Sequence, residues 1–432
     1  MGTTNRFVPN VYFSKKQELL RFLYTIGISI AALLLKILAL FDHKIRLGVQ
    51  GRKATFPNIQ KAIHPDDRTL WFHCASLGEF EQGLPVFKAL RKLCPNHKIV
   101  LTFFSPSGYE IRKNTDVADV VAYLSMDTIS NAKRFLDIVH PDLTVFVKYD
   151  IWPNYLLELK KQNRNAILIS ALFSDSQPYF KWYGSLMRRA LAAFRHIFVQ
   201  DEASQQLLES IGLSDTSISG DTRYDRVFDQ LSQDNSLPFM GDFKQGHVCV
   251  VIGSSWPEDE TLLVHFINNN LDNGVKYVFA PHNIRPELIN NLRSKIKAKS
   301  VIYSEMDGKD LSGFSVFIID TIGLLSKIYS YADIAYVGGA MGHTGLHNIL
   351  EPAVFGVPIV IGKNHKKFPE AQKMINQAGV QSVTGQEDLD KTLSALIASL
   401  ELRQKLGRQN GSFIEKNKGA LIQIIQIIRI YL

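Results

Sequence analysis

Glu79 is the residue whose surroundings best suit a general base. It follows the small residues of the segment His73–Phe80, and the bulky apolar run Thr69–Phe72 before it is typical of a strand buried in a parallel sheet. Apolar residues at helical spacing continue from Gly83 to Leu93. Because ligands of open α/β sheets bind beyond the carboxyl ends of the strands, Glu79 is expected to face a substrate. The alternative is an acid that only complements the dipole of the new helix.

Four more residues in the first half are expected to line the same cleft. Ser76 and Gly78 shape the turn that presents the acid, and Lys148 and Asp150 follow an apolar run that begins at Leu143. At the carboxyl end of a strand, this Lys and this Asp would contact hydroxyl or phosphate groups of a substrate. A buried structural ion pair between the two explains them equally well.

The second half of the chain has segments suited to binding a phosphate. Pro281, His282 and Arg285 end an expected strand, and a His with an Arg can neutralise a leaving phosphate. The stretch Gly338–Gly345 is rich in Gly, and a helix is expected to start near Asn348, where its N-terminus would favour an anion.

Two further observations belong to these segments. Glu351 would lie in the first turn of that helix, where it could accept hydrogen bonds from ribose hydroxyls. The segment Gly253–Glu260 combines Ser, Pro and acids, which is typical of a helix start and also of an anion nest. In both places the alternative is a tight turn or helix cap that serves packing alone.

Several familiar sites are missing from the sequence. It has neither a GxGxxG fingerprint nor a GxxxxGK[ST] loop, which argues against an NAD enzyme and a P-loop ATPase. His343, His347 and His365 have no acid at metal-ligand spacing, and no CxxC or HExxH motif occurs, so no metal and no cofactor are expected. The three cysteines are widely spaced in apolar segments and are expected to be reduced core thiols.

Length and charge restrict the class of protein. A chain of 432 residues is expected to form two domains of about 150 to 200 residues each. A formal net charge of +8 indicates an anionic partner. Nucleic acid is not expected, because no nucleic-acid-binding module or concentrated basic face with stacking aromatics is evident.

The N-terminal segment predicts a membrane anchor. Residues Phe22–Leu35 carry no charge, and the apolar character continues from Ile37 to Phe41 with Lys36 between. About 20 such residues can span a bilayer, and the stretch is too long for the apolar region of a signal peptide. A buried core helix is the alternative. Basic residues flank the segment on both sides, so its orientation is weakly determined, and the rest of the chain is expected on the cytoplasmic side.

The remaining chain alternates short apolar runs with helical patterns, which is typical of parallel sheets with crossover helices. A polar stretch with little periodicity interrupts this alternation and suits a linker. The expected organisation is an anchor segment at 1–48, a first Rossmann-like domain at 49–232, a linker at 233–246, a second Rossmann-like domain at 247–415 and a C-terminal helix at 416–432 packed on one of the domains.

An ordered set of motifs resembles the 3-deoxy-D-manno-octulosonic acid (Kdo) transferases of lipopolysaccharide assembly. The resemblance covers residues from about 20 to 430. The motifs are His73–Phe80, LTFFSPSG at 101–108, KYDIWPN at 148–154, SGDTRYD at 219–225, Pro281–Arg285 and HNILEPA at 347–353.

This resemblance implies an α/β protein of the GT-B glycosyltransferase fold, with two Rossmann-like domains facing across a cleft and an N-terminal anchor in the inner membrane. It implies an inverting transfer of Kdo from CMP-Kdo to an anionic lipid A precursor, lipid IVA. The first domain would take the acceptor, with Glu79 as base, and the second the donor. The implied CMP contacts are Pro281, His282, Ile322, Gly323, Leu324, Asn348, Ile349, Leu350 and Glu351.

The chain departs from the family's pattern at three places. Asp150 stands where Glu is frequent, Ile322, Gly323 and Leu324 stand where Met-Gly-Glu is frequent, and Leu346 replaces a Gly. A direct catalytic role for Asp150 is therefore open, and a CMP contact at 322–324 would be made largely by backbone. Two other functions compete: a GT-B transferase using a UDP-sugar and a lipid acceptor, and a membrane-tethered nucleotide-binding protein without turnover.

Overall fold

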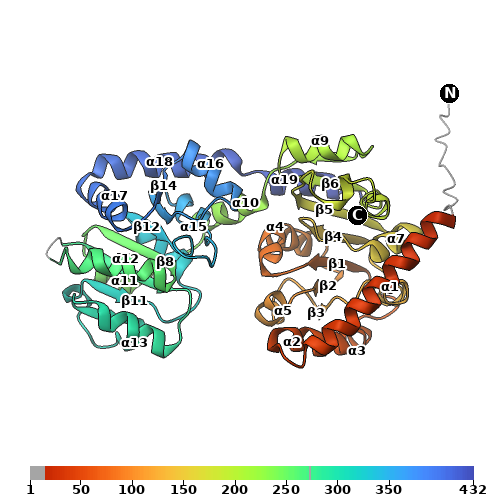
Figure 1. Cartoon of the computed structure of the whole chain (residues 1–432), viewed down its shortest axis with the longest axis horizontal. Coiled ribbons are helices and arrows are strands. Elements are labelled where there is room, and N and C mark those ends of the chain that lie inside the picture. Colours follow the sequence, from red (N-terminus) through yellow and green to blue (C-terminus); the bar gives the residue numbers. More distant parts are fainter. Residues whose placement is uncertain (1–14, 272–273) are drawn as a thin grey trace. The chain divides into compact units, whose positions relative to one another are not determined.

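The computed structural model describes residues 15–271 and 274–432 and divides the chain into two compact units (Figure 1). Unit 1 comprises the chain up to Thr222 together with Gly419–Leu432, and unit 2 comprises Arg223–Lys418. Residues 1–14 of the expected anchor segment lie outside the described part.

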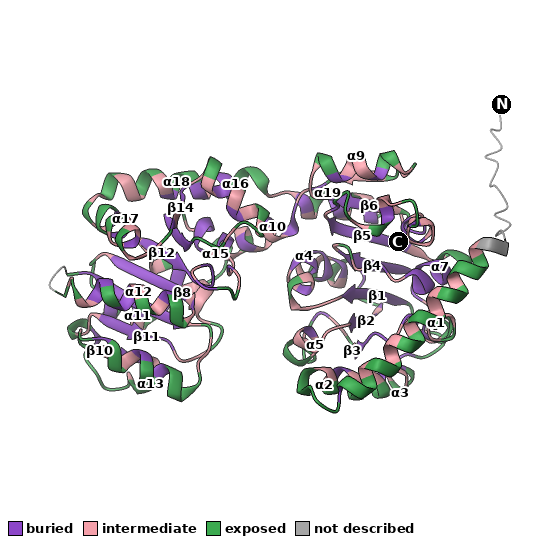
Figure 2. Cartoon of the chain, in the orientation of Figure 1, coloured by how far each residue is buried: buried purple, intermediate pink, exposed green. Residues whose placement is uncertain are grey.

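Unit 1 is built on a seven-stranded parallel sheet in the order β3-β2-β1-β4-β5-β6-β7. Its strands are β1 (Thr69–Cys74), β2 (Lys98–Phe103), β3 (Val120–Tyr123), β4 (Leu143–Val147), β5 (Asn165–Ala171), β6 (His196–Val199) and β7 (Thr216–Ile218). All of β1 is buried, because helices cover both faces of the sheet (Figure 2), and this burial explains its unbroken run of bulky residues.

The helices of unit 1 enclose two apolar clusters, one on each face of the sheet. Successive residues of β1 alternate between them, with Trp71 in one cluster and Leu70 and Phe72 in the other. The helices are α1 (Lys15–Leu38), α2 (His43–Gly51), α3 (Thr55–Ala62), α4 (Leu77–Leu93), α5 (Pro106–Arg112), α6 (Ile129–Val139), α7 (Pro153–Lys161), α8 (Ser185–Leu191), α9 (Glu202–Ser210) and α19 (Ala420–Ile428).

Unit 2 repeats this architecture with the order β10-β11-β9-β8-β12-β13-β14, again with parallel pairing. Its strands are β8 (Cys249–Ser255), β9 (Lys276–Pro281), β10 (Ser300–Ile302), β11 (Val316–Ile318), β12 (Ile334–Val337), β13 (Ile359–Gly362) and β14 (Val380–Val383). Its helices are α10 (Thr222–Asp229), which starts at the border of the unit, α11 (Pro238–Lys244), α12 (Pro257–Asn268), α13 (Pro286–Lys295), α14 (Leu325–Ile328), α15 (Leu350–Val354), α16 (Pro369–Gln377), α17 (Gln386–Ala398) and α18 (Leu400–Asn417).

The end of the chain returns to unit 1 through α19. Its residues Ala420, Ile424 and Ile428 are fully buried in the same cluster as Phe72 and Phe87. Apolar residues four apart lie on one face of a helix, which explains why the isoleucine-rich tail packs against the domain.

Residues 233–246 differ from the expected linker. They include α11, whose Met240 and Phe243 are fully buried in the core of unit 2, and the border between the units falls earlier, at residues 222 and 223. The polar, Pro-containing composition of the segment conceals a one-sided helix of seven residues. Strands β7 and β14 also escape the sequence pattern, because each is short and only partly buried.

Helix α1 lies on the surface of unit 1. Its segment Gln17–Leu38 has a mean hydropathy of 1.8 and is the one helix among the described residues with the length and composition to cross a membrane. Only 6% of its apolar window is buried, so the alternative of a core helix is wrong. Signal sequences share this length and composition, so the helix by itself is weak support for an anchor.

Candidate active site

In the sheet of unit 1, the order in which successive strands are added reverses between β1 and β4. The residues expected around Glu79 lie at this point. From β1 the chain builds outward to β2 and β3, whereas β4 starts the opposite half of the sheet. Such a switch point leaves a crevice at the carboxyl ends of the two central strands. Strand β1 leads into the turn that carries Ser76 and Glu79, and β4 leads into Lys148 and Asp150.

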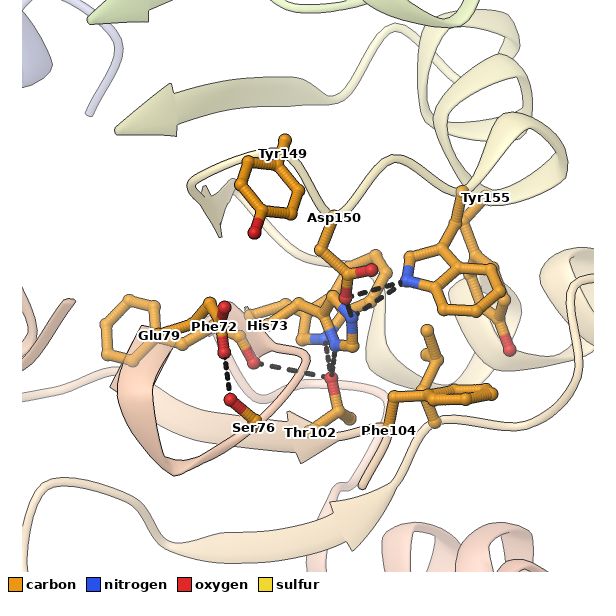
Figure 3. Close-up of polar contacts among 12 residues, drawn as sticks. Phe72, His73, Ser76, Glu79, Thr102, Phe104, Tyr149, Asp150 and Tyr155 are labelled. Carbon is orange, nitrogen blue, oxygen red and sulfur yellow. Dashed lines mark hydrogen bonds and ion pairs between the residues drawn. The ribbon is translucent and has the colours of Figure 1, made fainter. Parts of the chain in front are cut away.

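Glu79 stands in the first turn of α4, partly exposed at the end of β1 (Figure 3). The Ser76 hydroxyl donates a hydrogen bond to Oε2 of Glu79 and so fixes the direction of the carboxylate. Gly78 is exposed, and a Cβ there would meet only the Ser76 hydroxyl, at 3.8 Å. The turn therefore leaves open space beside the carboxylate, which suits an approaching hydroxyl.

Asp150 is paired with His73 rather than with Lys148 in the described structure. Nε2 of the fully buried His73 lies 2.6 Å from Oδ2 of Asp150, and the indole N–H of Trp152 donates to the same oxygen at 3.0 Å (Figure 3). The Lys148 ammonium lies 5.1 Å from the centre of the Tyr149 ring. The expected alternative of a Lys148 to Asp150 ion pair is therefore wrong.

The network around His73 fixes its tautomer. Nε2 must carry a proton, because it faces a carboxylate oxygen. Nδ1 lies 2.8 Å from Oγ1 of Thr102, which is the partner of His73 across β1 and β2 and which accepts a hydrogen bond from the indole of Trp71, also at 2.8 Å. The Thr102 hydroxyl then donates to Nδ1, since its other acceptor, the carbonyl oxygen of Phe72, is 3.4 Å away.

Cys74 lies beneath this crevice and is not placed to react. Its thiol is fully buried, and burial, followed by the charges of Glu79 and Asp150, raises the pKa of Cys74 well above its usual value. A thiol held neutral in this way is a poor nucleophile. The carboxylates are the groups of this crevice that can take a proton.

The second sheet has its own switch point, between β8 and β12. Three rings gather there: Trp256 stacks on His282 with centroids 4.6 Å apart, and His282 lies at the same distance from His347. The Trp256 indole N–H donates to Nε2 of His347 at 3.0 Å. A neutral His347 with its proton on Nδ1 is required, because Nε2 acts as an acceptor.

The electrostatics of these rings change one expectation. Burial, and then the nearby His282, lower the pKa of His347 to about 4, and burial lowers the pKa of His282. At pH 7 both rings are neutral, so His282 offers a phosphate a hydrogen bond rather than a full positive charge. Arg285 is exposed, and its Nε donates to Asn283 Oδ1 at 3.3 Å.

The glycine-rich turn after β12 is held by a buried carboxylate. Oδ2 of Asp259 accepts hydrogen bonds from the backbone N–H of Gly339 at 2.8 Å and of Trp256 at 3.0 Å, and the Tyr336 hydroxyl donates to Oδ1 at 2.8 Å. Gly339 has φ +95°, and a Cβ there would lie 2.0 Å from the carbonyl oxygen of Gly345. This geometry explains the glycine by packing of the turn.

The remaining expected donor residues lie in unit 2 on loops and on a short helix. Helix α15 starts at Leu350, two residues later than expected, and its first N–H donates to Asn348 Oδ1 at 3.1 Å. The Asn348 amide donates to Glu351 Oε1 at 3.0 Å, and Glu351 also borders a pocket of about 40 Å³ with Arg226. In the loop 321–324, Ile322 is 85% exposed and Gly323 has φ +96°.

The structure thus gathers the expected residues into two groups. Ser76, Gly78, Glu79, Lys148 and Asp150 lie at the switch point of unit 1, and the expected CMP contacts belong to unit 2. No group of three or more His, Cys, Asp or Glu suited to a metal occurs within residues 15–271 and 274–432.

Sequence reasoning missed His73, Thr102 and Trp152 in unit 1 and the stacking of Trp256 in unit 2. A polar His in the middle of an otherwise apolar buried strand was the available signal for the first group. No comparable signal marks the ring stack, because its members come from three separate segments of the chain.

Comparison with known proteins relates the chain to one family of enzymes. The sequence profile of the family described as "3-Deoxy-D-manno-octulosonic-acid transferase (kdotransferase)" matches residues 46–226, which include the whole sheet of unit 1. The 3-deoxy-D-manno-octulosonic acid transferase of Haemophilus influenzae is 27% identical over 390 residues, covering 85% of this chain and 88% of that protein.

Solved structures share the fold. The UDP-GlcNAc 2-epimerase of Neisseria meningitidis superimposes with a TM-score of 0.58 at 16% identity, covering 83% of this chain and 99% of that one. A glycosyltransferase of Rickettsia africae gives a TM-score of 0.55 at 13% identity, covering 85% and 98%. With two parallel-sheet α/β units, the chain has the GT-B fold. In sequence it is similar to the 3-deoxy-D-manno-octulosonic acid transferases, and it is a glycosyltransferase.

Proposed function

We propose that this chain transfers Kdo from CMP-Kdo to the lipid A precursor lipid IVA, with inversion at the anomeric carbon and with Glu79 as general base. The match of residues 46–226 to the family profile and the names of the curated relatives support the sugar that is transferred. Two Rossmann-like units, each with polar residues at the switch point of its sheet, support a division into an acceptor domain and a donor domain.

The position of Glu79 carries the mechanism. The oxygen of an acceptor hydroxyl attacks the anomeric carbon, its proton passes to Glu79, and CMP departs with the electrons of the broken C–O bond. A positioned carboxylate contributes about 10²- to 10⁴-fold to such a step. Glu79 lies at the switch point of unit 1 with its carboxylate held by Ser76, and the space above Gly78 is open.

The acceptor's other contacts are assigned to residues near Glu79. The Lys148 side chain is partly exposed at the end of β4 and is suited to a phosphate of the lipid. Asp150 acts through His73 and Trp152, which hold the loop after β4 against β1. The role of Asp150 is therefore to hold the residues that line the crevice in place, and Asp can do this although it is shorter than the Glu that is frequent at this position.

The donor is assigned to unit 2. His282 would donate a hydrogen bond to the phosphate, Pro281 and the loop 322–324 would contact CMP mainly through backbone, and Asn348–Glu351 would bind the ribose. Arg285 supplies an exposed positive charge next to these groups. No metal is assigned to the reaction, because hydrogen-bond donors and Arg285 can stabilise the leaving phosphate.

The location follows from the acceptor. Lipid IVA is anionic and resides in a membrane, and the chain carries a net charge of +8 and an apolar surface helix. We therefore assign the chain to the inner membrane, with its catalytic units on the cytoplasmic side.

The test uses the purified full chain with the tetraacyl disaccharide bisphosphate acceptor and mass spectrometry of the product. CMP-Kdo is expected to add one or more Kdo masses, and UDP-N-acetylglucosamine is expected to add nothing. Transfer from the UDP-sugar alone would replace the proposed donor, and binding of CMP-Kdo without any product would mean a nucleotide-binding protein without turnover. As a check on the donor site, His282→Ala is expected to raise the KM for CMP-Kdo while Asn290→Ala, on the exposed side of α13, leaves it unchanged.

A further inference from the structure

Helix α1 exposes an apolar face along its whole length. Phe22, Ile26, Ile30, Leu33 and Ile37 recur at spacings of three and four, so they line one side of the helix, and each is 41% to 59% exposed. Figure 2 shows this exposed side of α1 at the margin of unit 1. With 22 residues from Gln17 to Leu38, the apolar segment is about 33 Å long.

The opposite side of α1 is fastened to unit 1 by polar groups. Nε of Arg21 donates to Asn154 Oδ1 at 2.8 Å, and the Asn154 amide donates to Oγ1 of Thr25 at 3.1 Å. Tyr24 shares a hydrogen bond with Asp127, which is fully buried. These residues come from the inward stripe of the helix, one turn apart.

Both ends of the helix are fastened as well. Arg189 on α8 donates to the carbonyl oxygen of Gln17 at 3.3 Å, and Arg46 on α2 donates to the carbonyl oxygen of Ala39 at 2.8 Å. Ala39 itself is buried. Hydrogen bonds at the first residue of the apolar segment and just after its last residue thus hold α1 to unit 1, and Figure 1 shows α1 running along that unit.

These contacts are incompatible with a helix that crosses the bilayer. To cross, α1 would have to leave Asn154 and Asp127 and carry Arg21 and Tyr24 into hydrocarbon, where unpaired polar and charged groups are costly. A helix lying in the membrane plane keeps every one of these bonds and still places its apolar face in the acyl layer.

We propose that α1 is an in-plane membrane helix, with its apolar face in one leaflet and its polar face covered by unit 1 instead of by water. The inference deepens the membrane association in the proposed function and is independent of the reaction. The occupant of the exposed face is the lipid of an anionic membrane.

Two features beside the helix support lipid as the occupant. Trp182 is 91% exposed and Tyr183 is 59% exposed, in a loop that Arg188 of α8 holds by donating to the carbonyl oxygens of Tyr179 and Lys181. Helix α8 packs against α1. Trp and Tyr are enriched at the headgroup level of membranes, where such rings anchor a protein.

The charge beside α1 also matches an anionic surface. Lys36 and Lys44 are exposed at the C-terminal end of the helix, next to the exposed Phe41. Basic residues at this level attract the anionic headgroups of a membrane.

The side of the membrane on which the residues before α1 lie distinguishes a helix in the membrane plane from a helix that crosses the bilayer. Single cysteines are introduced by Thr4→Cys before the helix and by Ser174→Cys, which is exposed in unit 1; the native cysteines are buried. A membrane-impermeant maleimide is applied to spheroplasts and to inverted inner-membrane vesicles. Both positions are expected to be labelled in inverted vesicles only. Labelling of Thr4→Cys in spheroplasts, with Ser174→Cys labelled only in inverted vesicles, would mean a crossing helix and would overturn the proposal.

Partition identifies the occupant. Leu33→Glu is compared with Leu400→Glu on α18 of unit 2, because both leucines are 59% exposed. Binding of the full chain to vesicles containing phosphatidylglycerol is expected to fall about tenfold or more for Leu33→Glu and to stay unchanged for Leu400→Glu.

Two outcomes of the partition experiment would contradict lipid as the occupant. The first is equal vesicle binding by both variants. The second is a protein that is dimeric in buffer and becomes monomeric only with Leu33→Glu, since a second copy would then cover the face. Transfer of Kdo to detergent-dispersed acceptor is expected to be normal in Leu33→Glu, so failure of this inference and of the proposed function are separable.

Discussion

Replacing Asp150 by alanine removes a carboxylate, one oxygen of which accepts two hydrogen bonds. In the wild-type chain, Oδ2 of Asp150 accepts from Nε2 of His73 and from the indole of Trp152. The same indole N–H already lies 2.9 Å from Nε2 of His73, so after the substitution it can donate to that nitrogen instead. His73 must then move its proton to Nδ1, which faces Thr102 at 2.8 Å.

The magnitude follows from this rearrangement. Two charge-assisted hydrogen bonds are lost, one neutral bond from Trp152 to His73 is gained, and no buried donor stays unpaired. The expected net loss is about 2 kcal/mol, or a fall of roughly 4 to 8 °C in the melting temperature of unit 1. Asp175→Ala, which removes an exposed acid of the same unit, is the control and is expected to cost less than about 0.5 kcal/mol.

The assay combines calorimetry with NMR of protein labelled with ¹⁵N at histidine. The wild type is expected to show His73 protonated on Nε2, and Asp150→Ala is expected to show it protonated on Nδ1. An unchanged tautomer, or a loss above about 5 kcal/mol from two stranded donors, would refute the assignment of the network.

Three other predictions concern unit 2 and the metal-free mechanism. The pKa of His347 is about 4 in the folded chain and near 6.5 when unfolded, so the unfolded state binds more protons between these values. The free energy of unfolding of unit 2 is therefore expected to fall as the pH falls from 7 to 4.5, by at most the amount that follows from the binding of one proton. Denaturant titrations of wild type and His347→Phe at both pH values check this, and an equal pH dependence would contradict it. Gly339→Ala places a Cβ against the Gly345 carbonyl at a positive φ and is expected to lower the free energy of unfolding by about 2 to 5 kcal/mol. Gly385→Ala, with open space around the new Cβ, is the control. Similar melting temperatures of the two variants would refute the packing argument. Transfer activity is expected to survive overnight dialysis against EDTA, and loss that Mg²⁺ restores would show that a metal takes part.

The sequence predicted most of the strands because their residues are buried on both faces. The run Thr69–Cys74 has this character throughout, and the structure starts and ends β1 at the same residues. The sequence pattern did not reveal the edge strands β7 and β14, because they are short, only partly buried and contain Ser or Gln. Residues 233–246 misled for a related reason, since Met240 and Phe243 alone carry the burial of α11.

The candidate site was predictable where chain order places residues at strand ends. Glu79 follows β1 by five residues, and the strand-to-helix pattern revealed it. The pairing of His73 with Asp150 was not accessible in this way, because the two are 77 residues apart and meet only through the order of β1 and β4 in the sheet. The contact between Trp256 and His347, 91 residues apart, depends likewise on β8 lying beside β12.

The rate of Kdo transfer by Glu79→Gln tests the central claim most directly. Glutamine keeps the length of the side chain and can accept the Ser76 hydrogen bond through its amide oxygen, but it cannot take a proton. Glu110→Gln, which changes an exposed acid on α5, is the control. With CMP-Kdo and the lipid acceptor, Glu79→Gln is expected to slow transfer about 10²- to 10⁴-fold with unchanged binding of CMP, while Glu110→Gln transfers normally. Transfer by Glu79→Gln at the wild-type rate would contradict the assignment of Glu79 as the general base.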